Sequence, residues 1–221
     1  MNIDFDEFGY QKVSADDYFH FDCSDCGDCC RNVKNSVMVE SLDLYRLAQF
    51  FDIEMGEVIL QYADMVFLAW GFPAFMLKTK QHLNTCVFLK LSRCSVQGAI
   101  KPRVCRIFPL GVGPDDEKPG EWLSFIVSKK QHHFTGKRWL VGDWLDENLT
   151  QEDRAFVVAE YNYTGELARL MKKIDRKDEN RVLELMLLYK YTAFDTTEDF
   201  QSQYARNMEQ LKKQLTRISS R

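Results

Sequence analysis

The chain has 221 residues, 45% of them hydrophobic and 13% aromatic, and this composition predicts a globular protein with a real core. Its net charge of -4 argues against nucleic acid as a partner, because phosphate-binding proteins usually carry a basic stripe. No apolar run approaches the roughly 20 residues that span a bilayer, and the N-terminus lacks the apolar segment of a signal peptide, so we expect a cytoplasmic protein with no membrane partner.

The first 20 residues are acidic and aromatic, and we expect them to pack as an arm over the body of the protein. His20 stands three residues before Cys23. It is a candidate metal ligand, although a lone histidine near a loop is more often a packing residue that is held by a hydrogen bond.

Four cysteines follow within eight residues, at Cys23, Cys26, Cys29 and Cys30. Thiolates spaced three residues apart on a tight turn with a glycine converge on one soft metal ion, and Gly27 supplies such a turn. A disulfide framework is the alternative. It is disfavoured because the cytoplasm keeps thiols reduced and because seven cysteines would leave one unpaired. We therefore predict a metal site here.

The neighbours Cys29 and Cys30 raise the prospect of a second centre. Adjacent side chains usually diverge, so either one of these thiols is a bystander or two metal centres lie side by side. Two closed tetrahedral sites need about eight donors. The candidates in the rest of the chain are Cys86, Cys94, Cys105, His20, His132 and His133.

A strand and two helices are predicted after the cysteine run. Residues 37–39 have the pattern of a short strand, and apolar residues at helical spacing predict a helix over 42–51, capped by Ser41. The same spacing from 54 to 70 predicts a second helix. We therefore expect a helical hairpin inserted between the first four cysteines and the last three.

From residue 71 to 128 the chain becomes irregular. All five prolines lie between Pro73 and Pro119, which excludes long helices there and favours short strands and turns. The candidate strands cover 75–77 and 87–89, and the last three cysteines fall within this part.

Four separated cysteine motifs in this sequence resemble those of a known family. They are Cys23-x2-Cys26-Gly27-x-Cys29-Cys30, Cys86-Val87-Phe88-Leu89, Cys94-Ser95-Val96 and Lys101-Pro102-x2-Cys105-Arg106-x-Phe108-Pro109. In this order they resemble the bacterial and archaeal cysteine-cluster family of zinc- or iron-chelating proteins, over about 23–145. The resemblance implies that these cysteines coordinate metal, while the activity of the family is largely undefined. Flagellin lysine methylases are similar to this chain in the cysteine cluster alone.

The chain departs from the family pattern near its end. Family members often carry a further cysteine before a Gly-Lys pair, whereas this chain has His132 and His133 ahead of Gly136. Either a histidine replaces the missing thiolate in a Cys3His site, or one centre keeps an open position. The alternative is that both histidines lie on an exposed loop.

Basic residues crowd the cysteines, and nearby cations can offset the negative charge of thiolates around a divalent ion. Arg106 adjoins Cys105 inside the family motif and is the leading candidate for this role. The others are Arg31, Lys34, Lys101 and Arg103, and each could instead be ordinary surface charge.

Three helices are predicted in the last third of the chain. A long amphipathic helix starts at Thr150, residues 179–193 are apolar on nearly every side and predict a buried helix, and Thr197 caps a third. We expect an α+β fold that is mostly helical. In it, a metal-organised part of short strands (1–149) packs with a C-terminal helical part (150–221) as one domain.

Three classes of function remain. The first is a metal-binding protein that holds zinc or iron, as one or two ions or as an iron-sulfur cluster, and that could serve a protein partner. The second is an enzyme whose metal or iron-sulfur cluster modifies a protein side chain or a small molecule. The third is metal storage or transfer. Phosphate-binding loops, nucleophile elbows and zincin helices are absent from the sequence.

Overall fold

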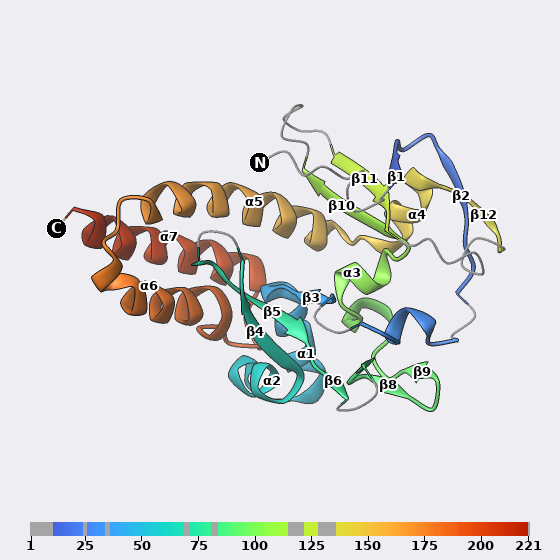
Figure 1. Ribbon diagram of the computed structural model, residues 1–221, viewed down its shortest axis with the longest axis horizontal. Helices are drawn as coiled ribbons and strands as arrows, with labels where there is room; N and C mark the ends of the chain where they lie inside the picture. Colours follow the sequence, from blue (N-terminus) through green and yellow to red (C-terminus); the bar gives the residue numbers. More distant parts are fainter. Residues whose placement is uncertain are drawn as a thin grey trace.

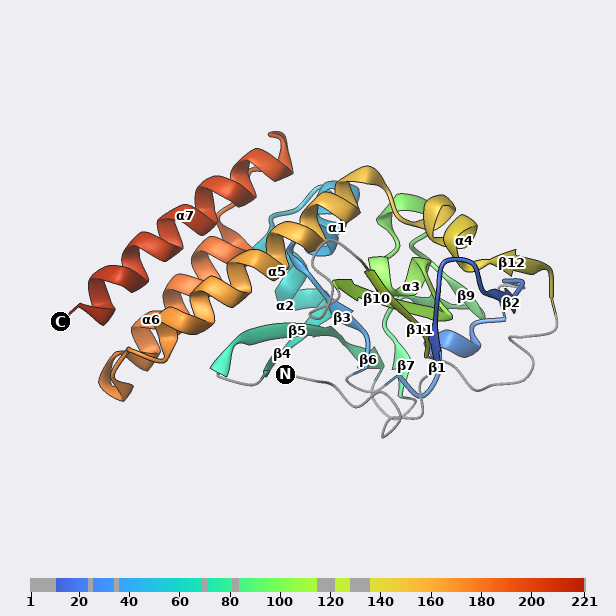
Figure 2. The ribbon, with the colours of Figure 1, turned by 90° about the horizontal axis from the view of Figure 1, so that it is seen from above.

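The computed structural model describes residues 11–23, 26–33, 36–68, 71–80, 84–114, 122–127 and 136–220. The predicted α+β class is confirmed, because helices combine with short antiparallel strands in small sheets. Long C-terminal helices occupy one side of the molecule, and the small sheets and short helices that carry the cysteines occupy the other (Figures 1 and 2). Within the described ranges, every helix is too short or too polar to cross a bilayer.

The first predicted helix is confirmed as α1 (Ser41–Phe51). Its N-cap is Glu40, and not Ser41 as predicted, because Glu40 and Asp43 close a capping box around the first turn. The Ser41 hydroxyl is engaged elsewhere and donates to the backbone carbonyl of Lys190 at 2.6 Å. The start of α1 is thereby attached to the C-terminal helices.

The prediction of a helix over 54–70 is wrong beyond residue 62. α2 (Met55–Tyr62) gives way to β4 (Ala63–Phe67), which pairs antiparallel with β5 (Pro73–Leu77). Gly71 adopts a φ of 75°, a left-handed conformation that suits glycine and lets the chain reverse between the two strands. β5 also pairs with β3 (Met38–Val39), so the strand pairing supplies the hydrogen bonds that a longer helix would have made.

The remaining strands form four small sheets. The arm contributes two strands, and residues 1–10 lie outside the described part of the chain. The candidate strand at 87–89 is instead a turn at Val87 and Phe88 between two separate strands. One sheet has three strands, with β1 (Gln11–Val13) and β10 (Leu110–Pro114) on either side of β11 (Trp122–Ile126). The other three are pairs: β2 (Tyr18–His20) with β12 (Arg138–Leu140), β6 (Thr79–Lys80) with β7 (Thr85–Cys86), and β8 (Leu89–Lys90) with β9 (Arg93–Cys94).

The C-terminal helices follow the predicted order with two corrections. Thr150 caps its helix as predicted. The third helix is capped by Asp199 and not by Thr197, because the Asp199 carboxylate accepts from the Ser202 amide at 2.7 Å. Residues 179–193 are not buried on nearly every side, since Leu188 is 46% exposed. The helices are α4 (Val141–Asn148), α5 (Gln151–Met171), α6 (Glu179–Met186) with its π-helical continuation (Leu187–Thr192), and α7 (Phe200–Ser219).

Two apolar cores meet near the last cysteine. The larger joins α1, α2 and the β3–β5 sheet to α5, α6 and α7. The smaller lies between the arm, β10 and α4. At their junction the buried Asp153 carboxylate of α5 accepts from Arg46 of α1 at 2.6 Å and from Arg106 at 2.7 Å. Arg106 ends the short helix α3 (Arg103–Arg106), which carries Cys105.

Candidate metal centre

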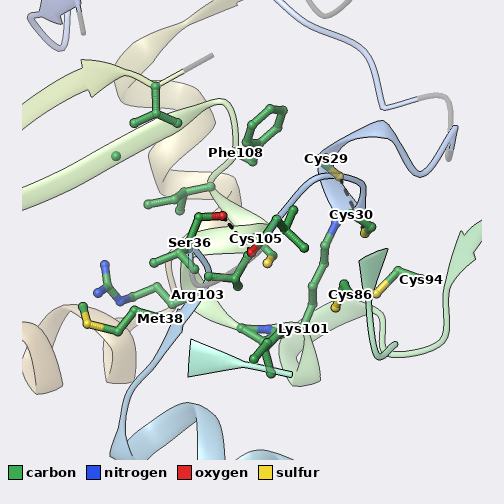
Figure 3. Close-up of a pocket in the computed structure, with 18 of the residues that line it drawn as sticks. Cys29, Cys30, Ser36, Met38, Cys86, Cys94, Lys101, Arg103, Cys105 and Phe108 are labelled. Carbon is green, nitrogen blue, oxygen red and sulfur yellow. Dashed lines mark hydrogen bonds between the residues drawn. The ribbon is translucent and has the colours of Figure 1, made fainter. Parts of the chain in front are cut away.

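Thiols from three stretches of chain surround one cavity of about 630 Å³. They come from the 3-10 turn η1 (Asp28–Cys30), from the β7–β9 region and from α3. Figure 3 shows these sulfurs around one end of the cavity. The five cysteines that line it are Cys29, Cys30, Cys86, Cys94 and Cys105.

The η1 turn brings two neighbouring sulfurs together. Gly27 precedes it with a φ of 71°, and a Cβ atom there would lie 2.8 Å from the Leu89 side chain and from the Ser92 carbonyl oxygen. Glycine is therefore required at this position. The Sγ atoms of Cys29 and Cys30 are 3.9 Å apart. The expectation that these side chains diverge is wrong here, because the alternation of an extended chain does not hold in a helical turn.

Two thiols come from the paired short strands. Cys86 in β7 is buried, and Cys94 in β9 is partly buried. Cys94 pairs with Leu89 across the β8–β9 ladder, and its thiol donates to the Val96 carbonyl at 3.0 Å. Tight strand pairing thus holds both sulfurs against the cavity.

Cys105 is positioned by α3, which is attached to α1. The Arg103 amide donates to an Asp43 carboxylate oxygen at 2.8 Å, and the Arg103 guanidinium donates to Glu40 through Nε at 3.1 Å. The Cys105 amide donates to the Pro102 carbonyl at 2.8 Å. The carboxylates of Glu40 and Asp43, which cap α1, therefore hold the start of α3.

A second cavity, of about 520 Å³, adjoins the first. Cys23 lines it together with Cys29, Lys101 and Cys105, and the last three residues line both cavities. Cys26 is exposed and lines neither of these two. Six of the seven cysteines thus lie around two neighbouring hollows.

Of the three predicted histidines, only His20 lies in the described part of the chain, and it is not brought to the thiols. His20 lies in β2, where its Nδ1 is 3.1 Å from the Gly136 carbonyl oxygen, and it lines neither cavity. This contact agrees with the reading of His20 as a packing residue. His132 and His133 lie outside the described residues.

The donor set suits a soft metal, although in the described structure no three of these sulfurs are arranged to hold one ion. Among the described residues, no group of three or more histidine, cysteine, aspartate or glutamate side chains is arranged to hold an ion. Sulfurs on a tetrahedral zinc, with bonds of about 2.3 Å, lie about 3.8 Å apart. The Sγ atoms of Cys29 and Cys30, 3.9 Å apart, already have this separation. A set made of sulfurs fits zinc or iron.

Hydrogen bonding lowers the pKa of one thiol in the cluster, whereas hydrogen bonding or burial raises the pKa of three others. The hydrogen bond between Cys30 and Cys29 lowers the pKa of Cys29 to about 6 and raises the pKa of Cys30. Burial raises the pKa of Cys86 and of Cys105, and Lys101 partly offsets the effect at Cys105. The cluster therefore contains one thiol that ionises readily and several that hold their protons until a cation replaces them.

Among the described basic residues that the sequence singled out, Lys101, and not Arg106, faces the thiols. Arg106 is 8% exposed and donates to Asp153 and to the Lys101 and Asn148 carbonyls. Arg103 points away from the sulfurs, whereas the Lys101 side chain extends toward Cys29 and Cys30 (Figure 3). Its place ahead of the Pro102–Cys105 element was visible in the sequence, but nothing there distinguished it from the arginines. Lys34 lies outside the described residues.

Arg31 has a different task at the edge of the cavity. Its guanidinium donates to the Cys26 carbonyl at 2.7 Å, to Asp28 at 3.4 Å and to the Ser92 hydroxyl at 3.3 Å. These bonds join the cysteine loop to the turn between β8 and β9. Arg31 therefore serves mainly to fix the loop.

The comparisons with known proteins agree with this arrangement of cysteines. Residues 22–131 match the model of the CxxCxxCC family, described as "Putative zinc- or iron-chelating domain". The match ends earlier than the expected 23–145, so that His132 and His133 fall just beyond it. No curated protein and no solved structure matches the chain. The chain therefore belongs, through residues 22–131, to this cysteine-cluster family of zinc- or iron-chelating domains.

Proposed function

We propose that this protein binds zinc or iron through the thiolates of its clustered cysteines, and that the bound metal organises the region around α3 and the short strands. The observation that carries the proposal is the lining of one cavity by five thiols from three separate stretches of chain. Unrelated buried cysteines have no reason to converge in this way. A metal ion gives such a reason, because it needs several donors at one point.

The ligands that we propose first are the five thiols of the larger cavity: Cys29, Cys30, Cys86, Cys94 and Cys105. Cys23 borders the adjoining cavity, which supports a second centre beside the first. Cys29 and Cys105 face both hollows, so either could belong to each centre. Cys26, His132 and His133 are secondary candidates, and a histidine would complete a set only if its loop reaches the sulfurs.

The test is metal content per chain by elemental analysis, on protein purified without air, for the wild type and three variants. We expect one or two zinc or iron atoms per wild-type chain. Cys86→Ser and Cys105→Ser should each lose at least one of them, because serine is a poor ligand for either metal. Val104→Thr is the matched control, since it replaces a methyl group by a hydroxyl of similar size beside the cavity without removing a sulfur. Full metal content in both cysteine variants would refute the proposal.

A second candidate function is an enzyme whose metal or iron-sulfur cluster acts on a bound molecule. The observation that favours it is the size of the larger cavity, about 630 Å³, because a single ion needs far less space. The walls away from the thiols are mostly apolar, with Met38, Leu77, Val112 and Phe125 among them. Mostly apolar cavities of this size with a few polar groups are typical of small-molecule sites.

Colour and labile sulfide separate the two functions. A brown protein with iron and acid-labile sulfide would favour the enzyme, because a cluster fills more of the cavity and can carry redox chemistry. A colourless protein with zinc and no open coordination position would favour the structural role.

A further inference from the structure

Lys101 places a positive charge among the thiols, and within the part of the chain that the structure describes its ammonium forms no ion pair with a carboxylate. The side chain is partly buried, and Figure 3 shows it directed at the Cys29–Cys30 pair. Burial disfavours the charged ammonium, so a cation at this position needs a compensating negative charge close by.

The backbone of Lys101 is held from the C-terminal part of the molecule. Arg106 Nε donates to the Lys101 carbonyl oxygen at 2.9 Å, and Arg106 Nη2 donates to Asp153 Oδ1 at 2.7 Å. The Lys101 amide donates to the Gly98 carbonyl at 3.2 Å. The start of the lysine side chain is therefore fixed by α3 and α5, and its reach toward the thiols follows from that position.

We infer that Lys101 is the counter-cation of the metal centre, and that the cofactor is of the net anionic class: a divalent ion with three or four thiolates, or an iron-sulfur cluster held by cysteines. This inference rests on the proposed function. A divalent ion with four thiolates carries a net charge of about -2, and with three thiolates and a histidine about -1. A centre with two thiolates and two histidines is neutral.

The charge of the centre matters because Lys101 is partly removed from water. A cation beside a neutral centre would keep its desolvation cost without compensation. Beside an anionic centre the same cation is stabilised, and the thiolates are stabilised by it in turn. The lysine should therefore strengthen metal binding while adding nothing to the stability of the metal-free chain.

The test compares three variants by zinc affinity, measured in competition with a chromophoric chelator. Lys101→Met should raise the zinc dissociation constant about tenfold or more, because it removes the charge and keeps the aliphatic length. Lys101→Arg should stay within about threefold of the wild type, since the charge is retained. Lys90→Met is the control: Lys90 is exposed in β8 and lines neither cavity, and its loss should change nothing.

A second readout excludes a merely structural role. The metal-free Lys101→Met protein should unfold at the same urea concentration as the metal-free wild type, or at a higher one. Equal loss of stability in the metal-free and zinc-loaded proteins would make Lys101 a packing residue and overturn the inference. When cobalt(II) replaces zinc in the wild type, the intensity of the thiolate-to-cobalt charge-transfer absorption should correspond to three or four sulfur ligands. Two or fewer would also overturn it.

The outcomes separate this inference from the function on which it rests. A wild-type protein that binds neither zinc nor iron would refute the proposed function and the role of Lys101 together. Tight binding by the wild type, with equal affinity in Lys101→Met, would refute the role of Lys101 alone.

Discussion

The C-terminal helical part and the cysteine part are stabilised in different ways. α5, α6 and α7 bury long apolar stripes against α1 and the β3–β5 sheet, and α7 alone buries Met208, Leu211 and Leu215 completely. Around the thiols, by contrast, the chain forms the 3-10 turn η1, the two-residue strands β7, β8 and β9 and the one-turn helix α3, and two cavities adjoin these short elements. Apolar burial suffices for the first, whereas the second has few backbone ladders, and the proposed metal would supply the cross-links that these ladders do not.

Buried charge joins the two parts. Asp153 of α5 binds Arg46 of α1 and Arg106 of α3, and Glu40 at the start of α1 binds Arg103 of α3. The cysteine part is thus held on the helical part by α3. We infer that residues 1–149 and 150–221 fold as one domain and not as two separable ones.

The largest expected effect is that of removing the helical part. A chain that ends at residue 149 should fail to fold, because α1, α2 and β5 would expose the apolar surface that they bury against α5, α6 and α7. Circular dichroism and urea unfolding of the shortened chain measure this, with the full chain as reference. Cooperative unfolding and full metal content in residues 1–149 would show two separable domains.

Metal removal should affect the cysteine part first. Zinc at thiolate sites contributes on the order of 10 kcal/mol to folding in small domains. After chelation under reducing conditions, we expect amides in η1, β7–β9 and α3 to exchange hydrogen faster, while α5 and α7 remain protected. Hydrogen exchange read by mass spectrometry measures both regions in one experiment. Unchanged exchange around the cysteines would show that the metal does not organise this part.

Breaking the junction at Asp153 should lower the free energy of unfolding by less than removing the helical part or the metal. Asp153→Asn removes the charge that Arg46 and Arg106 share and leaves two buried guanidinium groups less well paired, which costs about 3–5 kcal/mol. Asp146→Asn is the matched control, because its pair with Arg154 is exposed and worth at most about 1 kcal/mol. Urea unfolding of both variants gives the difference, and equal values would contradict a junction at Asp153.

Protonation of Asp153 in acid should lower the free energy of unfolding by the smallest amount of the four changes. Burial opposes ionisation of Asp153, but hydrogen bonds from Arg106 and Thr150 outweigh it and hold the pKa of Asp153 at about 2, below the ordinary value of 3.8. The ionised carboxylate therefore contributes about 2 kcal/mol above pH 4, and this is lost as the pH falls from about 4 to about 2. Unfolding of the metal-free protein across this range should show the loss, and Asp153→Asn should lack it.

The two parts also differ in how far sequence alone predicts them. Helical spacing and the Thr150 capping box predicted α5 correctly, because the forces that form an amphipathic helix are local. The same spacing failed after Tyr62, where pairing with β5 and the turn at Gly71 decided the structure. Strand pairing depends on distant residues, which periodicity does not reveal.

The candidate site shows the same division. The sequence pointed to all seven thiols; five line the larger cavity, Cys23 lines the adjoining one and Cys26 lines neither, and their role as metal ligands stays a prediction. The assignment of cations could not be made in this way. Arg106 adjoins a cysteine in sequence but is drawn to Asp153, and Lys101, four residues from Cys105, is the group that faces the sulfurs.

The central claim is that sulfur atoms of this cluster hold a metal, and X-ray absorption at the metal edge tests it most directly. On protein purified without air, the account predicts zinc or iron with a first shell of three or four sulfurs per metal, at about 2.3 Å for zinc. A shell made mainly of nitrogen and oxygen, or a protein without either metal, would contradict it.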